Sequence, residues 1–459
     1  MSLTVGMRPR TASMTERGDT VLVIGGGAAA VLAAHSLSQR GFFPLVIADG
    51  LIPGMGIAYA TTDNRHRLNV PAGRMSICAD DPEAFLRWIR TNADAGAGHG
   101  DFVPRAWYGA YLAGVLDDLV AEARAEHWRG RATSLQQTVG GVRATLCDGR
   151  TAMAFSAVLA VGCPPPTADW GPPALVHDGR LVADPWAPGM LAQIAGEGPR
   201  EVLLVGAGLT MVDVALSVAA RNPSARITAV SRTGLLPTAH RAVPSAAMPT
   251  PSLPSGAISL GSAREIVSQS IALAVRETGD WRPGVDALRP VTQALWNALS
   301  LSDRARFLRE DRRRWDVLRH RMAPQIADSI AGLRASGQLR LETLGSRDLS
   351  DYPWRDYDAV VACAGQGGSA SSDPLLAGML ASGSVRTDPL DLGLDCDEHG
   401  HPLSRDGQVW SAVSVVGALR RGQLWESTAI PELRAQAHAV AAHLGLRPGM
   451  RSSSRMLAS

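Results

Sequence analysis

Two glycine-rich turns are the residues of this sequence best suited to chemistry. The first, Gly25-Gly26-Gly27, follows the apolar run Val21–Ile24 and precedes the alanine-rich stretch Ala28–Arg40. Gly25 permits a tight turn, Gly27 lets a phosphate approach the backbone, and Ala30 is small enough for a helix to pack on the strand. The N-terminus of that helix carries the partial positive charge that a pyrophosphate needs. The pattern therefore predicts a dinucleotide site.

A second turn of the same kind starts at Gly206. Gly206-Ala207-Gly208 follows the apolar run Val202–Val205 and precedes a helical stretch, although the bulky Met211 stands at the third position of the pattern. The next apolar run ends in Ser231-Arg232 rather than in an acid. An arginine there suits the 2′-phosphate of NADPH, which a carboxylate would repel. The residues predicted to hold this nucleotide are Gly206, Gly208, Leu209, Thr210, Ser231 and Arg232.

Two such turns in one chain indicate a protein that binds two dinucleotides, one a flavin and the other a nicotinamide. After the first turn, the apolar run 44–48 ends at Asp49, about twenty residues beyond Gly27. A carboxylate at that point accepts hydrogen bonds from ribose hydroxyls. We therefore expect FAD at the first turn and NADPH at the second.

The composition excludes several other classes of protein. The 459 residues carry a net charge of +2, and all 45 basic residues are arginines. Without lysine, the chain can form neither a pyridoxal-phosphate Schiff base nor a P-loop. Its charges of both signs are interspersed, and no apolar run approaches the ~20 residues that span a bilayer. We expect neither a nucleic acid nor a membrane as a partner.

The five cysteines are widely spaced and include no C-x-x-C pair. This spacing argues against a redox-active dithiol and against a cysteine-rich zinc site, so no metal is predicted. An odd number of cysteines, without a signal-peptide pattern, suits the reducing cytoplasm, which is where we expect the protein.

Several longer strings resemble one family of bacterial proteins. They are Gly54-Met55-Gly56-Ile57-Ala58-Tyr59, Leu68-Asn69-Val70-Pro71-Ala72-Gly73-Arg74-Met75-Ser76, Asp184-Pro185-Trp186, Arg319-His320-Arg321-Met322 and Leu424-Trp425-Glu426-Ser427-Thr428-Ala429-Ile430-Pro431. Together they resemble the FAD/NAD(P)-binding proteins that include flavin-dependent N-hydroxylating monooxygenases of the nitrosuccinate-forming, aspartate-hydroxylating type. The resemblance extends from about Val21 to His443.

The resemblance implies that both ends of the chain hold FAD and that the middle holds NADPH. The residues it assigns to FAD are Gly25, Gly27, Ala28, Ala29, Asp49, Asn69, Val70, Arg74, Met75, Gly162, Gly417, Trp425, Thr428, Ala429 and Ile430. Two positions depart from the pattern: Val161 stands where related proteins usually have threonine, and Ala48 competes with Asp49 for the ribose position. Trp425 either shields the flavin or fills the core.

The expected fold class is α/β, with two Rossmann-like dinucleotide-binding domains of the class B flavin monooxygenase and glutathione reductase type. We expect a flexible tail over residues 1–20, a discontinuous FAD-binding domain over 21–165 and 355–459, and an NADPH-binding domain over 166–354. The second domain includes a helical insertion at about 262–337. Its arginine cluster, Arg309 and Arg312–Arg314, is expected to be a solvated helical face with local ion pairs.

The resemblance further implies an NADPH-oxidising FAD monooxygenase. Its substrates would be molecular oxygen and the amino group of a small amino acid such as aspartate, with a C4a-hydroperoxyflavin as the oxygen donor. Since the cofactor supplies the difficult step, no catalytic triad is required of the chain. Candidate substrate contacts are Arg289, His320, Arg321 and Arg421, each of which alternatively has a structural role. Two other functions remain open: a flavin reductase that passes electrons to a partner, and a flavin-binding module without catalysis.

Overall fold

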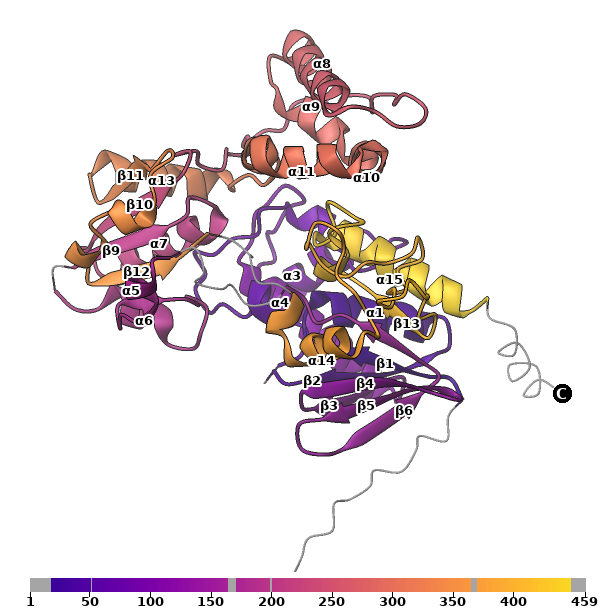
Figure 1. Cartoon of the computed structure of the whole chain (residues 1–459). Helices are drawn as coiled ribbons and strands as arrows, with labels where there is room; N and C mark the ends of the chain where they lie inside the picture. Colours follow the sequence, from indigo (N-terminus) through magenta and orange to yellow (C-terminus); the bar gives the residue numbers. More distant parts are fainter. Residues whose placement is uncertain (1–17, 51, 164–170, 199, 365–369, 447–459) are drawn as a thin grey trace, which may run out of the picture.

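The computed structural model of the chain describes residues 18–50, 52–163, 171–198, 200–364 and 370–446. Two parallel sheets of five strands each form its framework, and a helical lobe stands above them (Figure 1). Of the expected tail, Thr20 already belongs to the first strand. Residues 1–17 of that tail, together with 164–165 and 447–459 of the expected FAD-binding domain, lie outside the described residues.

The first sheet has the strand order β13-β7-β1-β2-β3. Its strands are β1 (Thr20–Ile24), β2 (Phe43–Ala48), β3 (Glu126–Arg129), β7 (Ser156–Leu159) and β13 (Val413–Val415). Successive side chains of a strand point to opposite faces. Val21 and Val23 pack under helices, whereas Leu22 and Ile24 pack on the other side. Residues 21–24 of β1 are all apolar because both faces of the sheet are covered.

Helices cover one face of this sheet, and a small antiparallel sheet with one helix covers the other. The helical face carries α1 (Ala28–Gln39), α3 (Ala84–Asn92), α4 (Arg105–Ala121) and α15 (Ile430–Leu444). The opposite face carries β4 (Ala132–Thr138), β5 (Gly141–Leu146), β6 (Thr151–Ala154) and α14 (Pro374–Ser382). Because α15 packs beside α1, the two ends of the chain build one domain (Figure 1).

The second sheet repeats this plan with the strand order β11-β10-β9-β12-β8. Its strands are β8 (Leu181–Val182), β9 (Glu201–Val205), β10 (Arg226–Ser231), β11 (Leu339–Thr343) and β12 (Ala359–Ala362). The helices are α5 (Pro173–Val176), α6 (Met190–Ala195), α7 (Leu209–Arg221) and α13 (Pro324–Ala335). Val202 and Leu204 of β9 pack with α7 and α13, and Leu203 and Val205 pack on the opposite face.

The helical lobe is shorter than the insertion expected over 262–337. It consists of α8 (Leu260–Thr278), α9 (Arg282–Ala287), α10 (Thr292–Ala298), α11 (Leu301–Glu310) and α12 (Arg312–Arg319). The last helix of the expected insertion, α13, packs instead against α7 and β11. Parallel strands such as β10 and β11 need a crossover connection, and α13 supplies it. The lobe is therefore inserted into that crossover.

The boundary expected at residue 355 is also wrong. β12 pairs in parallel with β9 and β8, so it belongs to the second sheet. Its four residues are fully buried, and they extend that sheet before the chain returns to the first domain. The remaining short helices are α2 (Gly56–Tyr59) and the 3-10 turns Ala72–Arg74, Arg289–Val291, Leu349–Asp351, Trp354–Asp356, Ala370–Ser372 and Ala418–Arg420. No helix among the described residues is long and apolar enough to cross a membrane.

Candidate functional site: two phosphate turns and the cavity between the domains

The first glycine turn has the geometry that the sequence predicts. Gly25 has φ +137°, and a Cβ there would collide with the carbonyl group of Ala160. Only glycine fits, since this φ is unfavourable for L side chains and the backbone at the end of β7 lies too close for a Cβ atom. Gly27 forms the N-cap of α1 with extended backbone, and the nearest atom to an added Cβ is the Cα of Gly56 at 3.9 Å. The space beside Gly27 is therefore open to a ligand.

The second turn has the same construction. Gly206 has φ +121°, and a Cβ there would collide with the carbonyl group of Cys363. Gly208 is the N-cap of α7 and has no atom within 4 Å of an added Cβ. Met211 is fully buried in the core that α7 shares with its sheet. Its bulk is accommodated there, so it does not prevent the helix from packing.

The C-terminal part of the chain closes on the first turn. Gly417 has φ +92°, and its added Cβ would lie 3.5 Å from the Cβ of Ala29 at the start of α1. The Gly417 N–H donates to Oε1 of Gln436 on α15 at 2.8 Å. Ile430, the first residue of α15, is buried in the same core as Met75. The structure thus brings together residues from both ends of the chain, as the resemblance implies.

A cavity of about 1840 Å³ lies between the first domain, the second domain and the helical lobe. All six residues predicted to hold NADPH line it, as do all four candidate substrate contacts. Of the predicted FAD residues, Asn69, Val70, Arg74, Trp425, Thr428 and Ala429 line it. The other FAD residues do not line this cavity; they are Gly25, Gly27, Ala28, Ala29, Asp49, Met75, Gly162, Gly417 and Ile430. The cavity therefore joins the second turn to the predicted flavin loops.

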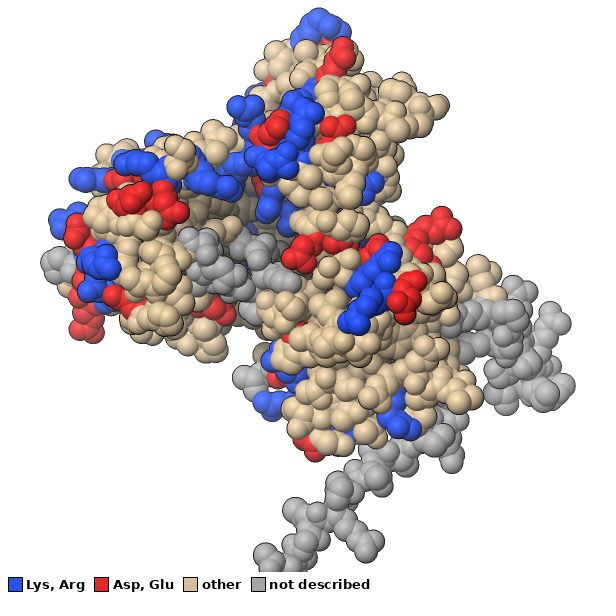
Figure 2. Space-filling model, viewed as in Figure 1, with Lys and Arg blue, Asp and Glu red and all other residues tan. Residues whose placement is uncertain are grey.

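The wall of this cavity is rich in positive charge. Among the described residues that line it, thirteen are arginines and seven are aspartates or glutamates. Figure 2 shows arginine side chains on the second domain and on the lobe, on both sides of the hollow between them. Such an excess of arginine suits phosphate and carboxylate ligands, which its planar fork binds with two hydrogen bonds.

Two of the four candidate substrate contacts are already paired with acids. Nε and Nη2 of Arg289 donate to the two carboxylate oxygens of Glu432, each at 2.8 Å. Arg321 is 2% exposed and donates to both oxygens of Asp286, at 2.8 and 3.1 Å. A fork that is occupied in this way is not available to a substrate carboxylate. The geometry therefore supports a structural role for Arg289 and Arg321, which was the alternative for both.

Arg421 differs from this pair. Its guanidinium lies 4.7 Å from the ring centre of Trp425, and no acid of the described residues is within ion-pair distance. Burial lowers its pKa, and the neighbouring cation Arg312 lowers it further. The carboxylate of Asp316 acts in the opposite direction, but it does not form an ion pair with Arg421. Arginine stays charged under such a shift, so Arg421 presents a cation to the cavity.

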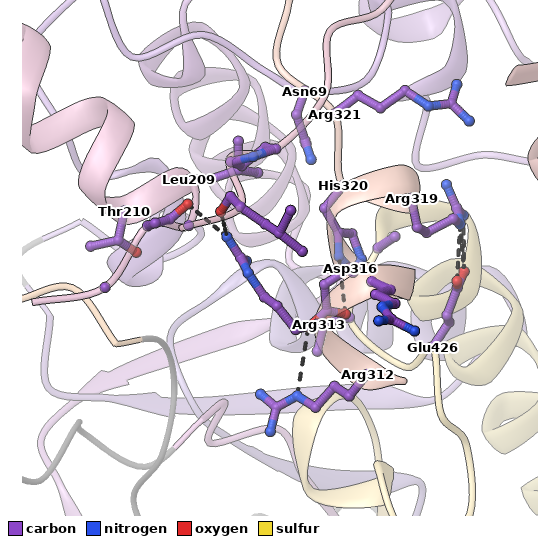
Figure 3. Close-up of a pocket in the computed structure, with 18 of the residues that line it drawn as sticks. Asn69, Leu209, Thr210, Arg312, Arg313, Asp316, Arg319, His320, Arg321 and Glu426 are labelled. Atoms are coloured by element: carbon purple, nitrogen blue, oxygen red, sulfur yellow. Dashed lines mark hydrogen bonds and ion pairs between the residues drawn. The ribbon is translucent and has the colours of Figure 1, made fainter. Parts of the chain in front are cut away.

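His320 and Arg312 share one carboxylate beside this cation. Nδ1 of His320 and Nε of Arg312 each lie 3.6 Å from an oxygen of Asp316 (Figure 3). Half of the His320 side chain is accessible, and that surface belongs to the cavity wall. Desolvation by the surrounding protein lowers the pKa of His320, so the ring is neutral at neutral pH. This part of the cavity wall therefore offers both a cation, Arg312, and a neutral base, His320.

Helix α12 connects the two domains, which the sequence did not indicate. Nη2 of Arg313 donates to the carbonyl oxygen of Ala207 in the second turn at 2.8 Å and to that of Leu235. Arg319 forms a two-point ion pair with Glu426, with Nε–Oε1 and Nη2–Oε2 distances of 2.9 Å (Figure 3). The expectation of a merely solvated arginine face is therefore wrong for Arg313, which is held against the second turn. A run of arginines gives no signal of which member is buried.

Trp425 fills a core and also lines the cavity. It is 7% exposed, stacks on Trp296 of α10 at 4.9 Å and meets the edge of Phe307 of α11. Nε1 of Trp296 donates to the carbonyl oxygen of Gly422 at 2.8 Å. This contact fastens the lobe to the C-terminal loop that the resemblance assigns to FAD.

The cysteines do not form a reactive pair among the described residues. Cys78, Cys147, Cys363 and Cys396 are free thiols, and burial raises the pKa of Cys163, which lines the cavity, to about 11. Cys363 also lines the cavity, and its pKa is raised further by its complete burial. These thiols are protonated at neutral pH and are therefore poor nucleophiles. Within the described ranges, no cluster of three or more histidine, cysteine or acidic side chains could hold a metal ion.

Comparison with known proteins supports the first domain directly. Residues 22–164 match a family model described as FAD-NAD(P)-binding, which confirms the prediction made from the first turn. No curated protein matches the chain significantly.

Solved structures show which fold the whole chain has. The reduced form of an ornithine hydroxylase from Pseudomonas aeruginosa is similar with a TM-score of 0.59 at 14% identity, over 93% of this chain and 98% of that chain. An ornithine N-hydroxylase from Kutzneria sp. 744, solved with FADred, NADP+ and L-orn, gives a TM-score of 0.57 at 13% identity over the same shares. A bacillithiol disulfide reductase from Staphylococcus aureus gives 0.53 at 11% identity, again over 93% and 98%.

These similarities confirm the expected α/β fold class. At such identities the likeness concerns the fold, which oxygenases and reductases share. The chain therefore has the two-domain fold of flavin monooxygenases and disulfide reductases, and within it residues 22–164 match the FAD-NAD(P)-binding family model.

Proposed function

We propose that the protein is an FAD-dependent, NADPH-oxidising monooxygenase that hydroxylates the amino nitrogen of a small carboxylate-bearing amine, such as aspartate. The observation that carries this proposal is the single cavity that joins the second phosphate turn to the predicted flavin loops beneath a wall rich in arginine. The similar ornithine hydroxylases act on an amine of a small amino acid, and their fold supports the same class of chemistry here.

The chain fits both cofactors. The open side of Gly27 at the N-terminus of α1 would receive the FAD pyrophosphate, and Gly208 at α7 would receive that of NADPH. Asp49 is exposed directly after β2, where it would meet the ribose of FAD, and Arg232 is exposed directly after β10 beside the 2′-phosphate position. Bound FAD, once reduced by NADPH, supplies the activation of oxygen.

The residues of the cavity would prepare the substrate. Arg421 would hold a carboxylate with its free fork, and Arg312 would hold a second one if it gave up part of its contact with Asp316. Amine hydroxylation needs a neutral nitrogen, and nearby positive charge lowers the pKa of an ammonium group. His320, neutral beside Asp316, would accept the proton that the ammonium group releases.

The test is a substrate screen of the holoprotein. Purified protein with bound FAD is mixed with NADPH, oxygen and a panel of amino acids, and products are analysed by mass spectrometry. We expect aspartate or a close analogue to stimulate NADPH oxidation and to yield a hydroxylamino or nitro product. If the whole panel gave only hydrogen peroxide, while a disulfide or quinone was reduced, the protein would be a reductase instead.

A further inference from the structure

A largely buried polar network lies between the two domains, and its hydrogen bonds and ion pairs involve none of the residues of the two glycine turns. It joins the loop 61–67 and Arg105 of the first domain to one side of α7 in the second. Buried polar groups cost free energy unless they are paired, so a network of this kind needs an explanation.

The helix α7 presents three polar side chains at intervals of four residues. Asp213, Ser217 and Arg221 share one side of the helix, because residues four apart in a helix lie one above the other. Asp213 and Ser217 are 7% and 0% exposed, although the rest of that stretch is almost entirely apolar. This stripe faces the first domain, not its own sheet.

Two ion pairs cross the domain boundary in opposite senses. Arg105 of the first domain pairs with Asp213 of α7 at 3.0 Å. Arg221 of α7 pairs with Asp63 of the first domain at 3.1 Å. Each domain therefore supplies one acid and one cation, which fixes the register of the contact, since sliding α7 by one turn would separate both pairs.

His66 completes the contact between these pairs. It is fully buried, and its Nε2–H points to the carbonyl oxygen of Asp213 at 3.2 Å and to Oγ of Ser217 at 2.8 Å. A carbonyl oxygen only accepts, so the proton of the neutral ring is on Nε2, and Nδ1 accepts from the hydroxyl of Thr61 at 2.6 Å. The Ser217 hydroxyl then donates to Asp63 at 2.6 Å. Every donor in this chain of hydrogen bonds has an acceptor.

The network is attached to both nucleotide sites. α7 begins at the second phosphate turn, with Gly208 as its N-cap. On the other side, the loop 61–67 is followed by Leu68 and then by the stretch from Asn69 to Met75 that the resemblance places along the flavin. The Arg105 N–H donates to the carbonyl oxygen of His66 at 2.8 Å, which links this loop to α4. A rigid connection thus runs from one nucleotide site to the other.

The Asp184-Pro185-Trp186 string also belongs to this contact. The indole ring of Trp186 meets the His66 ring edge-on at 5.5 Å, and the guanidinium of Arg105 lies 5.4 Å from its centre. Asp184 holds this turn by accepting from the Trp186 N–H at 2.9 Å. The indole ring of Trp186 thus covers part of the surface of both His66 and Arg105.

We propose that the stripe of Asp213, Ser217 and Arg221, with its partners Asp63, His66 and Arg105, is an interdomain clamp that positions the nicotinamide of NADPH against the flavin. Its members are positioning residues, since they contact neither phosphate turn. The clamp holds the two domains in one orientation, in which bound NADPH would be able to reduce bound FAD without domain rotation. This inference rests on the proposed function for its kinetic part alone.

The test compares Asp63→Asn and Ser217→Ala with the wild type. Arg226→Ala is the matched control, because Arg226 pairs with Glu201 on the surface of the second domain alone. For the holoproteins, stopped-flow measurement of flavin reduction gives a limiting rate and a dissociation constant for NADPH. We expect the limiting rate to fall about tenfold or more in both clamp variants, with a less than threefold change in the dissociation constant and no change in the control. Arg221→Lys, which keeps the charge, should retain most of the rate.

X-ray scattering of the cofactor-free proteins gives a second, independent readout. We expect the clamp variants to show a larger radius of gyration and a broader distance distribution than the wild type and the control. Unchanged flavin reduction in Ser217→Ala and Asp63→Asn would overturn the positioning role, whether or not the scattering changed. If NADPH did not reduce the wild-type flavin at all, the proposed function would fail, and the scattering alone would decide whether the clamp exists. Should Asp63→Asn not fold, Ser217→Ala carries the comparison.

Discussion

The two domains share one plan but differ in how their glycine turns are enclosed. Gly25 and Gly206 each lie against the backbone at the end of a neighbouring strand in the same sheet. Gly27 and Gly208 each cap a helix and have open space beside them. The first turn is then closed by Gly417 and α15 from the far end of the chain. The second turn opens into the large cavity. An enclosed site suits a resident cofactor, and an open one suits a nucleotide that must enter and leave.

The largest effect is expected where the glycine supports the fold itself. Gly25→Ala places a methyl group into the carbonyl of Ala160 at an unfavourable φ, and Gly206→Ala does the same at Cys363. We expect each change to destabilise its own domain by about 3–5 kcal/mol. Thermal unfolding followed by circular dichroism measures this. Stability near that of the wild type in both variants would show that each turn can move away from the neighbouring strand end to make room for the methyl group.

Gly27→Val should separate cofactor binding from folding. The backbone at Gly27 is extended and its surroundings are open, so valine is tolerated by the protein but blocks the approach of the pyrophosphate. We expect a folded, colourless protein, whereas the matched Gly208→Val protein stays yellow and loses affinity for NADPH. Absorbance near the flavin bands and circular dichroism decide the matter. A yellow, fully loaded Gly27→Val protein would remove the first turn from the FAD site.

Arg232→Ala tests the open site. Loss of a charge-assisted contact with the 2′-phosphate costs on the order of 1.5–3 kcal/mol, which is roughly a ten- to hundredfold increase in the Michaelis constant for NADPH. The constant for NADH should change little, because NADH lacks that phosphate. Steady-state kinetics with both donors measures the ratio. An equal loss with both would assign Arg232 a structural role.

Arg421 and Arg289 form a matched pair of arginines on the cavity wall. Arg421→Lys should raise the Michaelis constant of the amine substrate about tenfold and leave flavin reduction without substrate intact, because lysine loses the two-point contact. Arg289→Lys should mainly lower the melting temperature, since Arg289 is paired with Glu432. If Arg289→Lys reduced turnover at unchanged stability, the assignment of the two roles would be reversed.

The last prediction concerns pH and the boundary between the two domains. Burial lowers the pKa of His66 from 6.5 to about 4, so the unfolded chain binds a proton between these values while the folded one does not. His66 therefore makes the folded state lose stability as pH falls from 6.5 to 4, by about 1–3 kcal/mol in total. Burial raises the pKa of Asp63, but hydrogen bonds, among them one from Arg221, lower it more, so that the net pKa is below its usual value. Protonation of Asp63 therefore removes further folding stability at lower pH.

The contribution of His66 has to be separated from those of its acidic neighbours. Burial raises the pKa of Asp213 to about 6, so Asp213 makes the folded state gain stability as pH falls over the same range. The difference in unfolding free energy between wild type and His66→Gln cancels the carboxylates and isolates the histidine. We expect that difference to shrink as pH falls from 6.5 to 4. A difference independent of pH would mean that His66 binds a proton as readily in the folded state as in the unfolded chain.

Sequence reasoning was most successful where function depends on the local backbone. Gly25, Gly27, Gly206 and Gly208 all lie where the pattern predicts, because a turn between a strand and a helix is specified by neighbouring residues. It was less successful at domain boundaries. β12 was assigned to the wrong sheet, since four apolar residues fit either sheet equally well.

What the sequence determined by itself is the position of two glycine turns, each between a strand and a helix, in the pattern typical of dinucleotide binding. What only the tertiary structure decided is which charged residues are free. Arg289 and Arg421 look alike in the sequence, but Glu432 forms an ion pair with the first, and no described acid lies within ion-pair distance of the second. The clamp on α7 was hidden for the same reason, because its partners Asp63 and Arg105 lie more than a hundred residues away in the chain. Pairing between distant residues depends on how the domains pack, and spacing along the chain carries no record of it.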